Sequence, residues 1–146
     1  MKTLFLLLTF LISFIFANDL KRDNSLNVVV DSTNRLMWLD NSDVLKLKFT
    51  HEEATEYCEN LTYNSYSNWR IPDIKELKLI VDKRDRKTYI NRSFRYKVAD
   101  GFWAEKAHWR TLWFYADYMY FISGTAYFDS RHKKKYVRCV RSMQER

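Results

Sequence analysis

The sequence predicts an α+β fold in which two short helices precede a strand-rich last third. Each helix is marked by a capping box, where a residue that can cap the first turn is followed three positions later by a glutamate: Thr50 with Glu53, and Asp73 with Glu76. The last third is dense in aromatic residues, which favour strands. Hydrophobic residues occupy 47% of the 146 positions, enough for one domain with a buried core, and this excludes global disorder.

The first 17 residues are predicted to be a signal peptide. Lys2 precedes an uncharged run at 4–17, which is short for a bilayer-spanning helix but typical of a secretory signal. A polar run follows Ala17, so we expect cleavage there; because Ile15 is larger than the preferred small residue, an uncleaved N-terminal anchor is the alternative. We therefore expect an exported protein, in the periplasm or at the cell surface, whose mature chain of 129 residues carries a net charge of +6.

The chain after the signal is expected to contain one domain. We predict a short linker at 18–26, the domain at 27–142 and a tail at 143–146. The domain opens with two apolar runs, 27–30 and 36–39, which are separated by a turn signal. This pattern predicts an opening β-hairpin.

The first helix is the best-marked element of the sequence. It is expected to begin after Thr50, with Ala54, Tyr57, Cys58 and Leu61 recurring at the spacing of one helix face. Cys58 is therefore expected on the buried side of the helix, where another element can reach it.

The second helix and the segment after it are expected to differ sharply in polarity. The helix begins after Asp73 and places Ile74, Leu77, Ile80 and Val81 on one apolar face. The stretch that follows is basic and polar and reads as a long surface connection. Within it, core residues are expected only at three positions: Tyr89, Ile90 and Phe94.

The last third is expected to supply most of the strands. One strand begins at 101–103, an aromatic run covers 112–122, and a return strand covers 125–128 after a turn at Ser123 and Gly124. A basic tip at 131–135 then leads into the final strand.

Cys58 and Cys139 are the only cysteines, and in an exported chain they predict a single disulfide. Cys139 and Arg138 fall on opposite faces of the predicted last strand, 136–141, and we expect the cysteine on the core side. The bond would close a loop of 81 positions and stabilise the fold by roughly 4 kcal/mol. Two separate buried thiols are the alternative.

Four ordered blocks resemble the Lcl C-terminal domain family, a bacterial domain of largely unknown function named from a collagen-like adhesin. The blocks are DSTNRLMW at 31–38, ATEYCENL at 54–61, YSNWRIPDIKEL at 66–77 and YVRCVR at 136–141. The resemblance implies a C-type-lectin-like fold, with two helices packed on antiparallel strands, N- and C-terminal strands close together and one disulfide from a helix to the last strand.

The chain departs from the family pattern at two places. Asn64 and Ser65 stand where the family often has paired glycines, so this loop must rely on Asn for any left-handed backbone conformation. Ala104 and Glu105 replace the serines that follow Trp103 in the family, so a ligand contact by those serines does not carry over. The sugar-binding segments of calcium-dependent lectins are absent, and we predict no metal site and no cofactor.

Two basic clusters are the main candidates for ligand binding, because clustered cations attract anionic polymers. The alternative for both clusters is a solvated surface that aids solubility. A third candidate is the segment around Trp69, for which the alternative is a core tryptophan beside an arginine that pairs with a carboxylate. The candidate residues are Arg131, Lys133, Lys134 and Lys135; Lys83, Arg84, Arg86 and Lys87; and Trp69, Arg70 and Trp103.

Catalysis has little support in the sequence. His108 with the nearby Glu105 is the best acid–base pair that the chain offers, and no motif supplies a nucleophile. The sequence therefore predicts a non-enzymatic binding module of the cell envelope that recognises an anionic glycan or surface polymer. The alternative is a periplasmic structural or assembly module that binds another envelope protein. We expect no nucleic-acid partner, and membrane contact only through an uncleaved signal segment.

Overall fold

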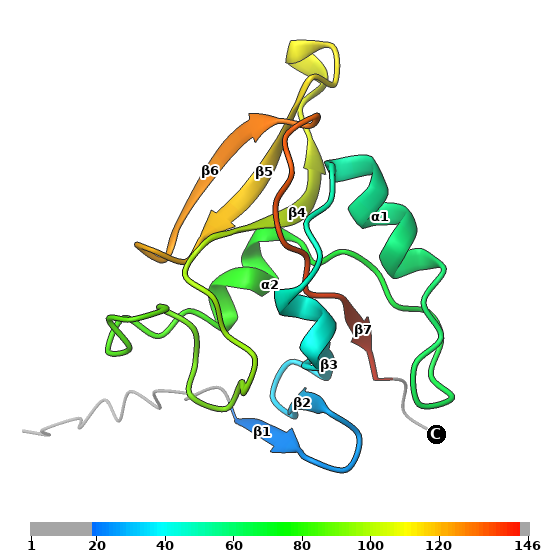
Figure 1. Ribbon diagram of the computed structural model, residues 1–146, viewed down its shortest axis with the longest axis vertical. Helices are drawn as coiled ribbons and strands as arrows, with labels where there is room; N and C mark the ends of the chain where they lie inside the picture. The colour runs from blue at the N-terminus through cyan, green and yellow to red at the C-terminus, as the bar shows by residue number, and fades with distance from the viewer. Residues whose placement is uncertain (1–18, 144–146) are drawn as a thin grey trace, which may run out of the picture.

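Residues 19–143, which the computed structural model describes, form two antiparallel sheets with two α-helices and two short 3-10 helices (Figure 1). The predicted signal at 1–17 and residues 144–146 of the predicted tail lie outside the described residues. The elements in chain order are β1 (Leu20–Asp23), β2 (Val28–Asp31), β3 (Leu36–Leu39), η1 (Ser42–Leu45), α1 (His51–Glu59), α2 (Ile74–Leu79), β4 (Gly101–Ala107), η2 (Trp109–Thr111), β5 (Tyr115–Tyr120), β6 (Thr125–Ser130) and β7 (Val140–Ser142).

The first sheet joins the two ends of the domain. Its strand order is β1-β2-β3-β7, with every neighbouring pair antiparallel. The β2–β3 hairpin confirms the predicted opening, and the pairing of β3 with β7 confirms that the first and last strands lie close together. Residues 20–23 correct the predicted linker, because their backbone pairs with β2 although their polar sequence lacks a strand pattern.

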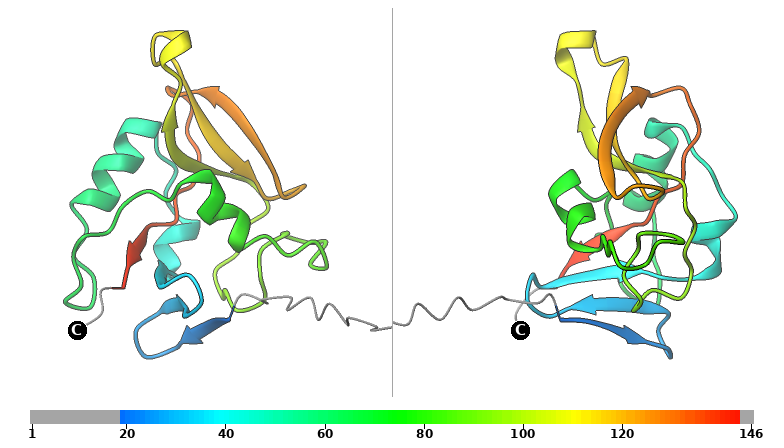
Figure 2. Two further views of the ribbon diagram at one scale, coloured as in Figure 1. Left: turned by 180° about the vertical axis from the view of Figure 1, so that it is seen from behind. Right: turned by 90° about the vertical axis from the view of Figure 1, so that its left-hand side faces the viewer.

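The second sheet has the order β4-β5-β6, with α2 packed against β4 and β5 and α1 against β4 (Figures 1 and 2). Both predicted capping boxes are present. Thr50 Oγ1 accepts from the Glu53 amide at 3.3 Å, and Asp73 Oδ1 accepts from the Glu76 amide at 2.7 Å. The two helices therefore begin at the residues that local capping chemistry specifies.

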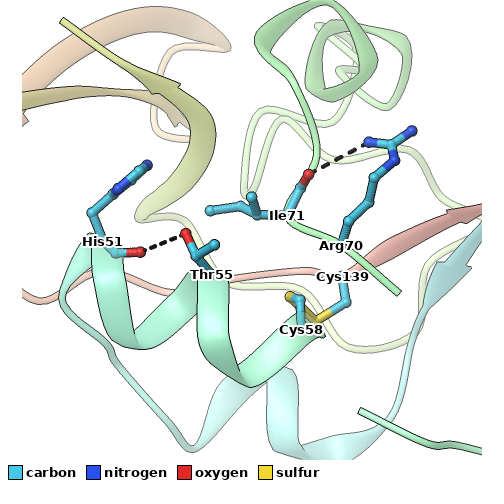
Figure 3. Close-up of a disulfide and its surroundings, with 6 residues drawn as sticks. All are labelled: His51, Thr55, Cys58, Arg70, Ile71 and Cys139. Carbon is cyan, nitrogen blue, oxygen red and sulfur yellow. Dashed lines mark hydrogen bonds between the residues drawn. A yellow bond between two sulfur atoms is a disulfide. The ribbon is translucent and has the colours of Figure 1, made fainter. Parts of the chain in front are cut away.

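The predicted disulfide joins the last turn of α1 to the residue directly before β7 (Figure 3). The Cα atoms of Cys58 and Cys139 are 5.5 Å apart, and both side chains are fully buried. The alternative of two separate thiols is therefore wrong. The bond lies in a core cluster that includes Trp69, Ile71 and Trp103.

The last strand is shorter than predicted. Residues 136–141 were expected to alternate as one strand, but regular pairing begins only at Val140. Arg138, expected to face away from the core, is fully buried because its guanidinium turns inward to Asp40. The buried Arg138 side chain therefore interrupts the predicted alternation of core-facing and outward-facing residues along this strand.

The long connection between α2 and β4 is held by buried side chains, as predicted. Ile90 and Phe94 are buried and Tyr89 is half-buried. The carboxylate of Asp40 accepts from the amides of Arg95 and Tyr96 at 2.8 and 3.1 Å, which ties this connection to the end of β3.

The loop that lacks the family glycines adopts left-handed backbone conformations, with φ of 50° at Asn64, 64° at Ser65 and 61° at Asn68. Asparagine tolerates this region better than most residues. The expectation that Asn replaces Gly in this role is confirmed, with Ser65 sharing it. No helix within residues 19–143 combines the length and the apolar composition needed to cross a bilayer.

Candidate functional site

The two predicted basic clusters lie far apart on the molecule (Figures 1 and 2). The basic loop, residues 83–87, projects from the side near α2, whereas the basic segment, residues 131–135, runs over the top of the second sheet next to α1. The fold therefore does not combine the clusters into one cationic surface, and each must be judged by its own surroundings.

The basic loop is organised by its own carboxylates. Arg84 makes two contacts with Asp82, at 3.0 and 3.2 Å. A hydrogen bond from Lys97, together with amide donors, lowers the pKa of Asp85 to about 2, which shows how firmly this carboxylate holds the turn. Lys83, Arg86 and Lys87 are exposed, so the loop offers isolated cations without an adjoining aromatic surface in the described contacts.

The basic segment divides its lysines between two roles. Lys133 and Lys135 both bind the carboxylate of Asp129 at 2.9 Å, and Lys135 also lies 4.0 Å above the ring of Tyr118. The side chain of Lys135 is only 12% exposed, so its ammonium serves the fold. Lys133, 64% exposed, and the exposed Lys134 are the members that can meet a ligand.

Asp129 is the carboxylate on which this arrangement depends. Burial raises the pKa of Asp129, and the hydrogen bonds from Lys135 and Lys133 outweigh burial and lower it to about 2. The carboxylate is therefore ionised at any physiological pH and keeps both lysines in place.

An open hollow of about 870 Å³ runs along the outer side of α1 and ends at Lys134. Its floor includes the rings of Phe49 and Tyr57, which stack with centroids 4.8 Å apart. The backbone of Phe49 pairs with that of Lys135 through hydrogen bonds of 2.8 and 2.9 Å, and this pairing carries Lys134 to the rim. The other lining residues are Lys48, Glu53, Glu56, Asn60, Leu61 and Thr62.

A tyrosine cluster lies on the other side of the basic segment. The rings of Tyr118, Tyr120 and Tyr127 are 6.0 to 6.2 Å apart from centroid to centroid, and Tyr127 is 47% exposed. Alternation along the paired strands β5 and β6 brings these side chains to one sheet face. This cluster was not singled out from the sequence, although the period-two spacing of Tyr118 and Tyr120 was the available signal.

Three predicted ligand residues belong to the packing of the protein instead. Trp69 is 2% exposed and donates its indole N–H to the Tyr66 carbonyl, while Trp103 is fully buried and donates to the Phe49 carbonyl. Neither ring is available to a ligand, which corrects the prediction for both.

Arg70 is the third of these residues. Its guanidinium donates two hydrogen bonds, of 2.8 and 2.6 Å, to the carboxylate of Glu76. Figure 3 shows its side chain extending away from the disulfide, with a hydrogen bond to the Ile71 carbonyl. The alternative interpretation, a core tryptophan beside a carboxylate-paired arginine, is confirmed. Such a paired guanidinium fixes the entry to α2 rather than a ligand.

The predicted acid–base pair has a different partner. His108 Nε2 lies 2.6 Å from Asp117 Oδ1, and Glu105 is exposed and takes no part in the pair. Glu105 and Asp117 do line one hollow with Asp73, but the Asp73 carboxylate caps α2. The residues that line this hollow include no hydroxyl or thiol side chain. Within residues 19–143, no group of three His, Cys, Asp or Glu side chains is placed to hold a metal ion.

One exposed apolar surface does not follow the predicted strand pattern. The tip loop, residues 108–114 between β4 and β5, exposes four large apolar side chains: Trp109 by 65%, Leu112 by 78%, Trp113 by 55% and Phe114 by 54%. The aromatic run at 112–122 had been predicted as strand throughout. Positive φ angles of 51° at Leu112 and 65° at Trp113 end that pattern, and β5 starts only at Tyr115.

The family comparison covers most of the domain. The model of the Lcl C-terminal domain matches residues 27–141. The chain belongs to this family. In this Lcl C-terminal domain the matched region runs from just before β2 into β7 and contains the disulfide, both basic clusters and the tip loop, whereas β1 lies outside it. No curated protein and no solved structure matches the chain.

Proposed function

We propose that this Lcl C-terminal domain is an exported, non-enzymatic binding module that recognises an anionic glycan or surface polymer. The observation that carries the proposal is the position of Lys134, an exposed cation at the rim of a hollow floored by the Phe49–Tyr57 stack. The disulfide supports export, since such bonds persist in oxidising compartments.

The hollow combines the groups that an acidic sugar requires. An aromatic floor can pack against the apolar face of a pyranose ring, and polar side chains at the rim fix its orientation. Glu56 and Asn60 offer acceptors and donors to sugar hydroxyls, while Glu53 is engaged in its capping box. Lys134, together with the neighbouring Lys133, would pair with a carboxylate or sulfate group of the glycan.

Lys48 has a different part in this surface. Its ammonium donates to Asp100 at 2.7 Å and lies 4.8 Å from the Tyr136 ring. That pairing leaves Lys134 as the cation of the rim with no salt-bridge partner among the described residues. We therefore expect Lys134 to contribute most of the charge-dependent affinity.

The proposal includes a C-type-lectin-like fold. Support comes from the two helices, the sheet in which the N-terminal strands and β7 lie together, and the disulfide from α1 to the residue before β7. Sugar binding would then use the α1 hollow rather than a calcium site, and we expect it to survive a chelator.

The test compares two variants with the same loss of charge. Lys133→Gln with Lys134→Gln removes the two exposed lysines of the basic segment, of which Lys134 lines the hollow, and Lys83→Gln with Lys87→Gln removes two from the basic loop. We expect the first variant to lose at least about tenfold in affinity for a heparin-like polymer and the second to change little. Titrations at two salt concentrations, with and without chelator, measure this. Equal losses in both variants, or salt-insensitive binding, would contradict the assigned site.

The aromatic floor gives a second readout. Tyr57→Ala is expected to weaken binding of the acidic glycan without altering its salt dependence, because stacking is not a charge interaction. A Tyr57→Ala variant with unchanged affinity would show that the polymer contacts the lysines alone and not the hollow.

The alternative function, a structural or assembly module that binds another envelope protein, is favoured by a separate observation, the exposed apolar side chains of the tip loop. A stoichiometric protein partner whose binding depends on Trp113, together with silence across acidic and neutral glycans, would favour it.

A further inference from the structure

We propose that the tip loop is a membrane-docking element that places its apolar side chains in the interface of an anionic lipid bilayer. This goes beyond the glycan-binding function, and it adds a membrane contact that does not depend on the predicted signal segment. The proposal commits to one occupant, the bilayer surface.

The first argument is shape. The tip loop, drawn in yellow, forms the end of the molecule beyond the second sheet in every view (Figures 1 and 2). Four side chains that are each more than half exposed surround this projecting end. A convex apolar point suits insertion into a soft, deformable surface, and amphipathic Trp residues favour the headgroup region of a bilayer.

The second argument is the backbone. A segment that enters a poorly hydrated region must satisfy its own polar groups. The carbonyl of His108 accepts from the Thr111 amide at 3.2 Å, the Trp113 amide at 3.1 Å and the Thr111 hydroxyl at 2.8 Å. The amides of Leu112 and Phe114 donate to other carbonyls of the loop at 3.0 Å. The amides of residues 111–114 are therefore all satisfied within the loop, while its large apolar side chains are exposed.

The base of the loop is anchored to the sheet. The His108 amide donates to the Tyr115 carbonyl at 2.8 Å, and the Arg131 amide donates to the Phe114 carbonyl at 2.9 Å. The imidazole of His108 holds Asp117 at 2.6 Å. A loop fixed in this way loses little conformational entropy when it docks.

The third argument is charge. No acidic residue occurs from Lys106 to Ala116. The Arg110 guanidinium lies 5.6 Å from the Trp109 ring, and Arg131 donates to the Trp113 carbonyl at 3.3 Å. Basic side chains beside an apolar point are attracted to the headgroups of anionic lipids.

Further charges surround this end of the molecule. His132 lies 6.5 Å from the Phe114 ring between centroids, and Lys133 and Lys134 follow it. The carboxylates near this end are Asp117, which is paired with His108; Asp129, which is paired with Lys133; Glu52, which shares a hollow with Trp113 and Arg131; and Glu105. Lys106 shares a hollow with Trp109 and Arg110, and the five basic side chains Lys106, Arg110, Arg131, Lys133 and Lys134 outnumber these four carboxylates, so an anionic surface is favoured over a neutral one.

Tryptophan fluorescence is a selective probe of the tip loop, because the other three of the five tryptophans are buried. Trp38, Trp69 and Trp103 are at most 2% exposed, so Trp109 and Trp113 are the tryptophans that lipid can reach. The experiment uses the chain from residue 18 onward with its disulfide intact, which retains every described residue. It is mixed with vesicles of phosphatidylcholine, with or without phosphatidylglycerol, whose acyl chains carry bromine as a fluorescence quencher.

We expect a blue shift and quenching of tryptophan emission with the phosphatidylglycerol vesicles, and weaker effects with phosphatidylcholine alone. Leu112→Ser with Phe114→Ser keeps both reporter tryptophans of the loop. This variant is expected to weaken partitioning at least about tenfold, because it removes two apolar side chains that the bilayer would bury. Ile122→Ser is the matched control, since Ile122 is 48% exposed at the opposite end of the second sheet.

Three outcomes would overturn the proposal. The first is absence of quenching in both kinds of vesicle, and the second is an equal loss in the Ile122→Ser control. The third is a concentration-dependent dimer, formed without lipid and abolished by Leu112→Ser with Phe114→Ser, which would make a second copy the occupant. Thermal melts of each variant show whether it is folded, and Trp113→Ser, which removes one reporter, supplies a second tip variant assayed by vesicle flotation.

Discussion

Arg138 and Asp40 form an ion pair in the core of the domain, with Nη1 of the arginine 2.8 Å from Oδ1 of the aspartate and both side chains fully buried. The guanidinium also donates to the carbonyls of Leu39 and Tyr96 and lies 4.5 Å from the Phe94 ring. The carboxylate receives Arg22 on its other oxygen. This pair connects the end of β3, the connection before β4 and the segment that enters β7.

Removing one partner of this pair is expected to destabilise the fold by about 3–5 kcal/mol, because loss of Asp40 leaves the buried guanidinium of Arg138 without its carboxylate, and loss of Arg138 leaves the carbonyls of Leu39 and Tyr96 without their donor. Arg138→Met and Asp40→Asn both test this by urea unfolding. Arg84→Gln is the control, since its pair with Asp82 lies at the surface with 88% of the arginine side chain exposed, and its loss is expected to change the stability little. Similar effects of the buried and surface variants would contradict the assigned role of the pair.

The disulfide is expected to contribute roughly 4 kcal/mol, since it closes a loop of 81 positions in the unfolded chain. The double variant Cys58→Ala with Cys139→Ala should lower the free energy of unfolding by about that amount and leave no lone thiol. Thiol labelling of the denatured, unreduced protein should find no free cysteine. Two labelled thiols per chain would contradict both the bond and the oxidising compartment.

Acid is expected to destabilise the domain through Asp129. Its pKa is about 2 in the folded protein against an ordinary value of 3.8, so on acidification the unfolded chain takes up the proton first. The stability that the ionised carboxylate confers is therefore fully present above pH of about 4 and is lost as the pH falls to about 2, by roughly 2 kcal/mol.

Asp129→Asn should lose this stability already at neutral pH and flatten the pH dependence of unfolding between about pH 4 and 2. Asp43→Asn is the control, because Asp43 is a half-exposed carboxylate whose contact with Lys46 is 3.5 Å. A pH profile of Asp129→Asn that matches the unmodified chain would assign the acid sensitivity to another group.

Arg70 is expected to act on stability and not on binding. Arg70→Met removes both hydrogen bonds to Glu76 and should cost about 1–2 kcal/mol, because the pair is half-exposed and Glu76 keeps its capping role. Its affinity for a heparin-like polymer should stay within about twofold of the unmodified chain. A loss of affinity without a loss of stability would contradict this assignment and would indicate that Arg70 contacts the ligand.

The local signals of the sequence predicted much of the fold. The capping boxes at Thr50 and Asp73, the β2–β3 hairpin and the buried face of α1 depend on neighbouring residues, so they can be read from spacing alone. The cysteine pairing followed from there being only two cysteines. Strand β1 was missed because its polar residues pair through the backbone, which leaves no side-chain pattern to read.

The candidate site could be predicted only in part. The basic residues at 131–135 were identified, but only the tertiary structure shows that Lys135 is enclosed whereas Lys133, which shares its partner Asp129, is exposed. The Phe49–Tyr57 hollow that gives Lys134 a binding context was not predicted. Its parts come from different segments, and only the backbone pairing of Phe49 with Lys135 brings them together.

The sequence by itself determined the family, the helix starts and the two cysteines that must pair, because capping chemistry and the ordered family blocks are properties of nearby residues. The tertiary structure decided which side chains are buried. It turned Arg138 inward to Asp40, enclosed Trp69 and Trp103, separated the two basic clusters and left Trp109 and Trp113 outside. Burial and ion pairing depend on which distant segments supply the neighbours of a side chain, and no local pattern encodes them.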